Sequence, residues 1–396
     1  MTFKKPNDTL QTGNVMIKIL HVASFSGNIG DNANHYGLRK QIAKHLGEPV
    51  EYTELEIRKF YQNYREPDRL RFDSSFAKLA NEHDHVVIGG GNFFEIWLEN
   101  SSTGTTIDMP IEIVDSIKTP IFFFGLGFDP YKGVPEGNIE KFKKFIDRLY
   151  DKKIHTITVR NDGSHQHIER LLGSSYLGKI EKVPDGGFFL EIDSPSEKTF
   201  NIPNPYIAIN VAKDMKNLRF IGNDLGISYE DFIASFSEIL NGILFQYPSL
   251  ELVFVPHIFS DLDAIHDVLK HLKETHRRNR VSVAPLLHGE DSEQEIFDIY
   301  RKALFSMGMR FHTNVCSIAL NTPTIGLASY PKLNDLYHEI GFPQRVVSVN
   351  QKGFEKKLHP LIFDTFSSRD SIKREYGHLV LQLGQISDNI FQKHFG

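Results

Sequence analysis

The chain has 396 residues, which is long for a single hydrophobic core, so we expect two domains. Its 40% hydrophobic and 24% charged residues are typical of a globular protein, and a net charge of -5 excludes the basic surface that nucleic-acid binding requires. Cys316 is the single cysteine, which excludes a disulfide framework and a cysteine-rich metal site. We expect Cys316 to pack in a core.

The sequence has no apolar run near the roughly 20 residues that a membrane-spanning helix needs. Residues 1–15 are polar and lack the apolar segment of a signal peptide, so we interpret them as a loose extension. We therefore expect a cytoplasmic protein with no transmembrane segment.

Strand-like and helix-like segments alternate along the first half, which is the pattern of a parallel sheet covered by helices. A charged, aromatic segment that follows residue 56 is predicted to be helical as far as residue 81. Residues 191–205 are rich in Ser, Pro and Asn and show no periodicity, which predicts the domain boundary there. The predicted strands of this half span residues 16–25, 50–56, 85–88, 120–124, 155–159 and 180–183.

The alternation starts again in the second half, with a helix predicted over residues 229–245 and a helical pattern from residue 370 to the end. The predicted strands span residues 206–211, 250–255, 281–283, 303–308, 324–327 and 346–349. The fold class is therefore α/β, with two Rossmann-like domains over residues 16–195 and 205–396. The carboxyl ends of both sheets are expected to line a central cleft.

The most informative motif is the segment 307–314 (MGMRFHTN), in which a buried strand breaks at Gly308 and a helix begins near His312. If the backbone is still extended there, Arg310 and His312 point to the same side. A fixed cation, an imidazole and a helix amino terminus suit an anionic substrate with a proton to transfer. The alternative is a structural arginine–carboxylate pair and a capping histidine.

Two glycine-containing loops follow strands of the first half. The loop 27–31 (GNIGD) opens a helix, and its backbone amides suit an anion or a sugar hydroxyl, although the dinucleotide fingerprint G-x-G-x-x-G is absent. Asp31 either caps that helix or contacts a ligand, and one residue can do both. The loop 89–92 (GGGN) indicates a close approach of the backbone to a ligand or to a neighbouring loop.

His257 follows Pro256 at the end of a buried strand and is expected to face the cleft. His165 and His167 lie on different sides of a predicted helix, and no other histidine pair has convincing metal-ligand spacing. The sequence also lacks the G-x-S-x-G elbow, the phosphate loop and H-E-x-x-H. We therefore expect no metal ion.

These motifs resemble those of the polysaccharide pyruvyl transferases, and the resemblance extends from residue 17 to residue 332. This family has Arg-Asp where the chain has Arg160-Asn161, with Asp162 one residue later, so the role of Asp162 is left open. The most specific matches are the segments 308–312 (GMRFH), Pro323 and 330–332 (YPK); the weaker ones are 27–31, 89–92, 159–160 with Ser164, 184–185 and 256–257.

The resemblance implies a fold similar to that of two-domain, GT-B-like glycosyltransferases. It also implies phosphoenolpyruvate as donor and a hydroxyl pair of a sugar, in a polysaccharide or glycan precursor, as acceptor. The product would be a pyruvate ketal, with phosphate released and no cofactor besides this co-substrate. His312 would act as the general acid, and either Asp31 or His257 as the base. The donor site would comprise Arg310, His312, Lys332 and Arg160.

The cations of this hypothesis come mainly from the second half, whereas the loops of the first half are neutral and suit sugar hydroxyls. We therefore expect the first domain to bind the acceptor and the second to bind the donor. The alternative is that the glycine loops only hold the domain interface together. The acceptor site would comprise Asn28, Asp31, Gly90, Gly91 and Asn92.

Two other functions remain open on the sequence. The first is glycosyl transfer from a nucleotide sugar, because the same fold hosts that reaction. The second is a non-catalytic scaffold that binds a glycan. A polymeric or lipid-linked acceptor would bring the protein to the inner face of a membrane without anchoring it there.

Overall fold

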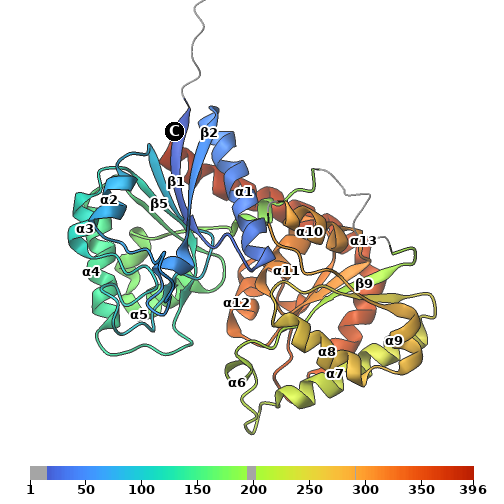
Figure 1. Cartoon of the computed structure of the whole chain (residues 1–396). Helices are drawn as coiled ribbons and strands as arrows, with labels where there is room; N and C mark the ends of the chain where they lie inside the picture. The colour runs from blue at the N-terminus through green and yellow to red at the C-terminus, as the bar shows by residue number, and fades with distance from the viewer. Residues whose placement is uncertain (1–15, 194–201, 290) are drawn as a thin grey trace, which may run out of the picture.

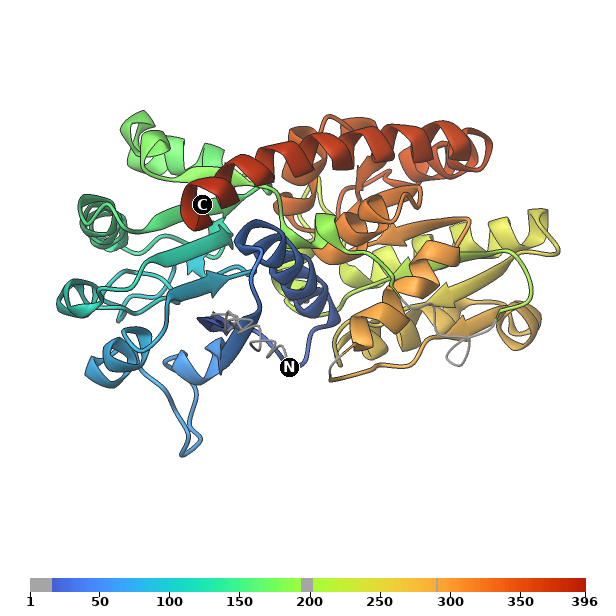
Figure 2. The ribbon, with the colours of Figure 1, turned by 90° about the horizontal axis from the view of Figure 1, so that it is seen from above.

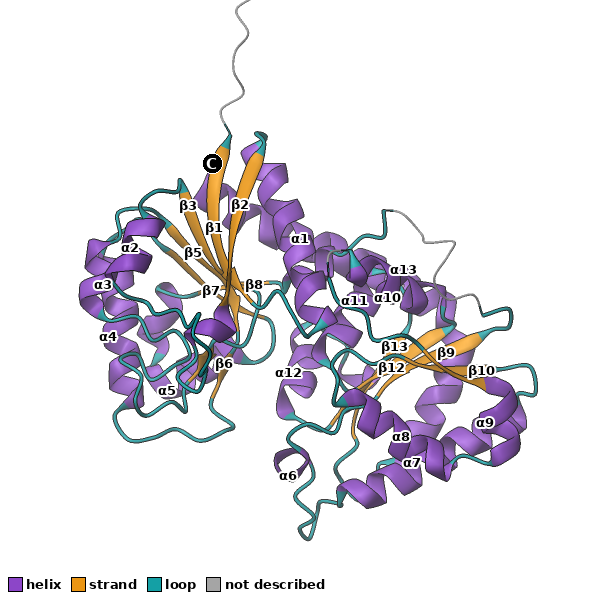
Figure 3. Cartoon of the chain, in the orientation of Figure 1, coloured by secondary structure: helices purple, strands orange, loops and turns teal. Residues whose placement is uncertain are grey.

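The computed structural model describes residues 16–193, 202–289 and 291–396, which form two α/β domains side by side (Figure 1). Within these residues the strands make two six-stranded parallel sheets and a separate two-stranded ladder. Helices cover both sheets (Figure 3). The predicted α/β class with two Rossmann-like domains is therefore confirmed.

The first sheet has the strand order β2-β1-β3-β5-β7-β8, so the direction in which strands are added reverses between β1 and β3. Its strands are β1 (Ile17–Ala23), β2 (Val50–Glu56), β3 (His85–Gly89), β5 (Ile121–Leu126), β7 (Thr156–Arg160) and β8 (Glu181–Val183); β4 (Phe94–Glu95) pairs with β6 (Phe128–Asp129). The helices of this part are α1 (Ile29–Leu46), η1 (Ile57–Phe60), α2 (Ser74–Ala80), α3 (Ile111–Ser116), α4 (Asn138–Asp151), α5 (Ser164–Leu172), η2 (Ser174–Gly178) and η3 (Gly186–Phe189).

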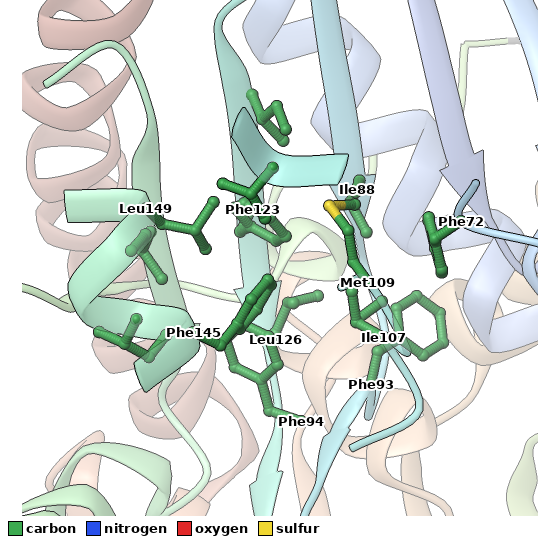
Figure 4. Packing of buried hydrophobic residues seen from close by; sticks show 14 of the residues in the cluster. Phe72, Ile88, Phe93, Phe94, Ile107, Met109, Phe123, Leu126, Phe145 and Leu149 are labelled. Atoms are coloured by element: carbon green, nitrogen blue, oxygen red, sulfur yellow. The ribbon is translucent and has the colours of Figure 1, made fainter. Parts of the chain in front are cut away.

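Strand β5 shows why the buried strands of this sheet are apolar runs: its alternate side chains enter two different cores. Phe123 packs on one face with Phe94 and Phe145, at ring-centroid distances of 6.1 and 6.0 Å (Figure 4). Phe122 and Phe124 lie on the other face, in the cluster that contains α1 and the end of the last helix.

The second sheet has the order β11-β10-β9-β12-β13-β14 and reverses between β9 and β12. Its strands are β9 (Tyr206–Asn210), β10 (Glu251–Phe254), β11 (Val281–Val283), β12 (Phe305–Gly308), β13 (Thr324–Ala328) and β14 (Val346–Ser348). The helices are α6 (Lys216–Arg219), α7 (Tyr229–Gln246), α8 (Asp261–His271), α9 (Glu274–Arg280), α10 (Ser292–Lys302), α11 (Phe311–Ala319), α12 (Pro331–Glu339), η4 (Pro343–Arg345) and α13 (Glu355–Phe395).

Two helices connect the domains. The start of α1 packs into the second domain, where Ile29 and Ala33 share a core with the buried Cys316. Helix α13 runs over both domains, and its last turns lie against the first sheet (Figure 2). In the described part of the chain, no helix, α13 included, is both long and apolar enough to cross a membrane.

Two helix predictions were wrong in part. The segment after β2 is helical only in η1 and α2, because Asp73 starts a new helix by accepting hydrogen bonds from the backbone amides of Ser75 and Phe76. Helix α13 begins at Glu355, well before the predicted start. Its first turns include Pro360, but Leu358 and Ile362 are fully buried, so packing outweighs the low helix propensity of proline.

The extension 1–15 and residues 194–201 of the expected boundary segment lie outside the described residues. The domain limits at 195 and 205 therefore remain predictions. The two sheets occupy separate stretches of the chain, with β8 ending at Val183 and β9 beginning at Tyr206.

Replacing Phe391 with Ala should destabilise the protein by roughly 3–5 kcal/mol, the usual cost of removing a buried phenylalanine side chain. Phe391 is fully buried and its ring centroid lies 5.3 Å from that of Phe122 and 5.6 Å from that of Phe124. The free energy of unfolding is measured by chemical denaturation. Leu381→Ala is the matched control on the same helix, because Leu381 is 70% exposed. Equal effects of the two changes would show that the end of α13 does not hold the first domain.

Candidate active site

A cavity of about 300 Å³ lies between the domains, outside the carboxyl ends of both sheets. It lies beside the reversal of strand order in each sheet, after β1 and β3 in the first and after β9 and β12 in the second. Its wall has six basic and four acidic side chains, although the chain as a whole is acidic, so the cavity favours an anion. The basic residues are Arg58, Lys132, Arg160, Arg219, Arg310 and Lys332; the acidic ones are Asp31, Glu95, Asp129 and Asp214.

Arg310 forms ion pairs with two carboxylates of its own domain. Its Nη2 lies 2.5 Å from Oδ1 of Asp261 and 2.7 Å from Oδ1 of Asp214, and its Nε also donates to Asp261. The structural arginine–carboxylate pair is therefore present. Among the described residues, Nη1 of Arg310 has no hydrogen-bond or ion-pair partner, which leaves that nitrogen for a ligand.

The condition under which Arg310 and His312 would share one side, an extended backbone between them, is not met, although both residues line the cavity. Helix α11 begins at Phe311, and Arg310 is its extended amino-terminal cap, with φ -78° and ψ 141°. The alternation of a strand ends at this cap. Arg310 therefore faces carboxylates of the second domain, whereas His312 faces Asp31 and Asp185 of the first.

The His312 imidazole lies between two carboxylates. Its Nε2 lies 3.4 Å from Oδ1 of Asp185, and its Nδ1 lies 3.9 Å from Oδ1 of Asp31. The ring packs directly on Gly30 in the first turn of α1, where a Cβ atom would lie 2.5 Å from Nδ1 of His312. A side chain at residue 30 would displace the imidazole, which explains the second glycine of the GNIGD loop.

The two carboxylates beside His312 have opposite pKa shifts. Burial alone would raise the pKa of Asp185, but His312, Arg160 and the backbone amide of Gly187 outweigh it and lower this pKa. Burial raises the pKa of Asp31, and the nearby His312 and Arg58 offset this only in part. Asp185 therefore remains ionised, while Asp31 can exchange a proton more readily.

The role of Asp162, left open by the sequence, is to neutralise buried cations. Its Oδ2 accepts a hydrogen bond of 2.8 Å from Nε of Arg160 and lies 3.4 Å from Nζ of Lys332. Arg160 also donates to Asp185 at 3.2 Å and stacks over the Phe311 ring at 4.3 Å. Asn161, which replaces the aspartate of the family pattern, accepts a hydrogen bond from the backbone amide of Asp185.

Lys332 lies at the start of α12 and reaches across to the first domain. Its Nζ donates to Oδ1 of Asn92 and lies 3.4 Å from Oδ2 of Asp129. Tyr330, from the same YPK segment, also donates to Asp129 at 3.0 Å. Lys332 therefore lines the cavity and holds the two domains together at the same time.

Four of the five predicted acceptor residues line the cavity, namely Asn28, Asp31, Gly91 and Asn92. Asn28 caps α1 by accepting a hydrogen bond from the backbone amide of Gly30. Gly90 was placed there wrongly. Its φ is +79°, and a side chain on it would collide with Asn34 of α1, so Gly90 is a glycine for packing reasons.

His257 lines the cavity but its ring is engaged in the protein interior. It is 1% exposed, and its Nε2 lies 2.9 Å from the Tyr300 hydroxyl and 3.2 Å from Oγ1 of Thr313. Burial lowers the pKa of His257 well below its ordinary value. Within the residues that the structure describes, no group of three or more His, Cys, Asp or Glu side chains is arranged to hold a metal ion.

Sequence reasoning missed several residues of this cavity, chiefly Asp214 and Arg219. Arg219 donates to Ser329 at 3.1 Å and to Oδ2 of Asp214 at 3.3 Å, so Asp214 bridges the guanidinium groups of Arg219 and Arg310. The sequence contained a signal for both residues, because they follow β9, the first strand of the second half, and the loops after strand ends line the cavity. Their counterpart in the first half is the loop after β1 that supplies Asn28 and Asp31.

Asp185→Asn should destabilise the protein by roughly 3 kcal/mol or more at neutral pH, because Arg160 would lose a buried carboxylate. The pKa of Asp185 is lower in the folded protein than in the unfolded chain. The ionised carboxylate therefore contributes fully to the free energy of unfolding above about pH 4, and this contribution is lost as the pH falls below that value. The free energies of unfolding of wild type and variant should therefore converge in acid. Asp151→Asn, at an exposed position of α4, is the control. A difference that does not depend on pH would contradict the pKa shift.

Solved structures with this fold are remote in sequence. A glycosyltransferase from Rickettsia africae has a TM-score of 0.56 at 12% identity, covering 96% of both chains. A UDP-GlcNAc 2-epimerase from Neisseria meningitidis, bound to UDP-GlcNAc, has a TM-score of 0.51 at 12% identity and covers 93% of this chain and 100% of its own. At such identities the likeness establishes the GT-B-like fold alone.

No curated protein sequence is significantly similar to this chain. The sequence profile of the polysaccharide pyruvyl transferases, however, matches residues 28–330, which include the loop 27–31 except Gly27, the loop 89–92, the GMRFH segment and Tyr330. The chain therefore belongs to the polysaccharide pyruvyl transferase family.

Proposed function

We propose that this protein transfers pyruvate from phosphoenolpyruvate to a hydroxyl pair of a sugar, forming a ketal and releasing phosphate, with no further cofactor. The observation that carries this proposal is the position of His312 on the wall of a cavity rich in cations, in a chain of this family. A proton donor beside several arginines suits a small substrate that carries both a phosphate and a carboxylate.

The donor is best accommodated on the side of the second domain. Arg310 has a nitrogen without a partner among the described residues, and Arg219 lies beside it across Asp214. The amino terminus of α11 adds its backbone amides and dipole to these charges. An anion here would interact with two guanidinium groups that pair with Asp214 and Asp261, and Nη1 of Arg310 is available to bond it.

The reaction requires two hydroxyl groups and one general acid. His312 gives a proton to the methylene carbon of phosphoenolpyruvate, and the adjacent carbon becomes electrophilic. The first sugar hydroxyl forms a C–O bond with that carbon and loses its proton. The second hydroxyl then forms the other C–O bond and loses its proton, while the bond to the phosphate oxygen breaks and inorganic phosphate leaves. Arg310 would stabilise the departing phosphate.

Asp31 is the better candidate for the base of this reaction. It lines the cavity within 3.9 Å of His312, and its raised pKa suits a group that accepts and returns a proton. His257 suits the role less well, because its Nε2 is engaged by Tyr300 and Thr313. Asn28, Gly91 and Asn92 line the same cavity and offer neutral groups to the acceptor hydroxyls.

The proposal is tested by comparing ligands. Phosphoenolpyruvate should raise the melting temperature of the protein, and UDP-sugars should not, because a ligand stabilises the state that binds it. Release of phosphate should follow when a competent glycan is added. Stabilisation by a UDP-sugar alone would instead favour a glycosyltransferase, and stabilisation by a glycan alone would favour a binding scaffold.

His312→Ala should lower the rate of phosphate release by roughly 100-fold or more, which is the usual size of a general-acid contribution. Phosphoenolpyruvate affinity, measured by calorimetry, should change much less, because the arginines that hold the anion remain. His288→Ala, which removes an exposed imidazole, is the matched control. A His312→Ala variant with turnover near that of wild type would show that another group supplies the proton.

Arg310→Lys should weaken phosphoenolpyruvate binding by about tenfold or more, because lysine keeps the charge but cannot bond Asp261 and a ligand through one planar group. The dissociation constant is measured by calorimetry, with the melting temperature as a check on folding. Arg278→Lys on α9, where the arginine side chain is 73% exposed, is the control. An unchanged dissociation constant would place the donor elsewhere, for example against Arg160.

A further inference from the structure

Trp97 is the single tryptophan of the chain and is 40% exposed beside the cavity. Its indole Nε1 donates a hydrogen bond of 2.9 Å to Oε2 of Glu95. The ammonium group of Lys132 lies 5.6 Å from the centre of the indole ring and 2.6 Å from Oε1 of Glu95. Glu95 and Lys132 both line the cavity, so they connect the exposed ring to the candidate active site.

Trp97 lies in a turn directly after β4, and its contacts with Glu95 and Lys132 set the direction of its side chain. Phe94 and Ile96 are fully buried in the core of the first domain, and Figure 4 shows Phe94 there. Glu95 lines the cavity instead, and Trp97 is 40% exposed, so both side chains lie outside this core. The hydrogen bond between their side chains agrees with this arrangement.

The backbone on both sides of Trp97 is fixed by hydrogen bonds. The amide of Ile96 donates to the carbonyl of Asp129 in the neighbouring β6 segment, and the amide of Leu98 donates to the carbonyl of Gly104. The loop that follows is held by buried hydroxyl groups, since Thr103 bonds both Thr105 and the carbonyl of Ile107. The ring is therefore presented by a rigid support, which lowers the entropy cost of binding a ligand to it.

We propose that Trp97, Glu95 and Lys132 form a subsite for a neutral sugar ring of the glycan acceptor. An indole ring offers an apolar face to the C–H groups of a sugar, while a carboxylate and an ammonium beside it can bond the hydroxyl groups. The paired charges of Glu95 and Lys132 cancel, which suits an uncharged sugar. This inference rests on the proposed function, which supplies the reacting sugar in the cavity itself.

The position of the subsite indicates the size of the acceptor. Trp97 is not part of the cavity wall, whereas Glu95 and Lys132 are, so a sugar on the indole lies at the mouth of the cavity. The sugar that receives pyruvate must lie deeper, within reach of His312. The acceptor is therefore a glycan of at least two sugars, and a free monosaccharide is bound more weakly.

The fluorescence emission of Trp97 reports directly on ligand binding at this subsite, because the chain has no other tryptophan. The wild-type protein is titrated with lactose, cellobiose, maltose and chitobiose, and with glucose for comparison. At least one disaccharide should change the emission saturably and at lower concentrations than glucose does. If none of the four disaccharides changes the emission up to its solubility limit, the subsite is ruled out.

Variants separate a direct contact from an indirect one. Trp97→Ala should raise the dissociation constant of the bound disaccharide by about tenfold in calorimetry, and Trp97→Phe by much less, because phenylalanine keeps an aromatic face. Phe245→Ala, at a position of α7 that is 79% exposed, should have no effect. Disaccharide binding by Trp97→Ala equal to that of wild type would overturn the proposal.

Phosphoenolpyruvate affinity is measured in the same set of proteins and should be equal in wild type and Trp97→Ala, because the donor lies against the second domain. This measurement distinguishes the two proposals. Disaccharide binding at Trp97 without any binding of phosphoenolpyruvate would contradict the proposed reaction and leave the subsite standing. Binding of phosphoenolpyruvate with no response of Trp97 to any disaccharide would contradict the subsite and leave the proposed reaction standing.

Discussion

Neutralising buried cations at the boundary between the domains is the constraint on which the site depends. Arg160 and Lys332 are only 5% and 8% exposed, and a buried charge without a partner is strongly destabilising. His312 and Lys332 come from the second domain, but the carboxylates that face them, among them Asp162 and Asp185, come from the first. The charge of Lys332 is matched only when the two domains are in contact, so the contact and the chemistry of the cavity are formed together.

The same constraint determines where a ligand can add charge. Lys332 and Arg160 already have carboxylate partners, so they hold the domains and shape the electrostatic potential of the cavity. Arg310 and Arg219 also pair with carboxylates, but Nη1 of Arg310 has no hydrogen-bond partner among the described residues. A change to any of these residues affects folding as well as binding, and the free energy of unfolding must therefore accompany each affinity.

Helices α1 and α13 each begin in one domain and pack against the other. The first turn of α1 follows a strand of the first sheet, yet it packs in the core of the second domain and brings Asn28 and Asp31 to the cavity. Gly30 allows the His312 ring to lie directly on this turn. Helix α13 starts in the second domain and ends on Phe122 of the first, which fixes the angle between the sheets that the site requires.

The sequence by itself determined the alternation of strands and helices, the two parallel sheets, and the GMRFH, GNIGD and YPK segments, because apolar periodicity and glycine positions are local properties. It did not determine which cation meets which carboxylate. Asp261 carries no local signal, and the pairing of Asp214 and Asp261 with Arg310 depends on loops far apart in the chain. The sequence left open whether the backbone is still extended between Arg310 and His312, and the start of α11 at Phe311 shows that it is not. Only the tertiary structure decided these points, because an ion pair between domains depends on distance in space and leaves no pattern along the chain.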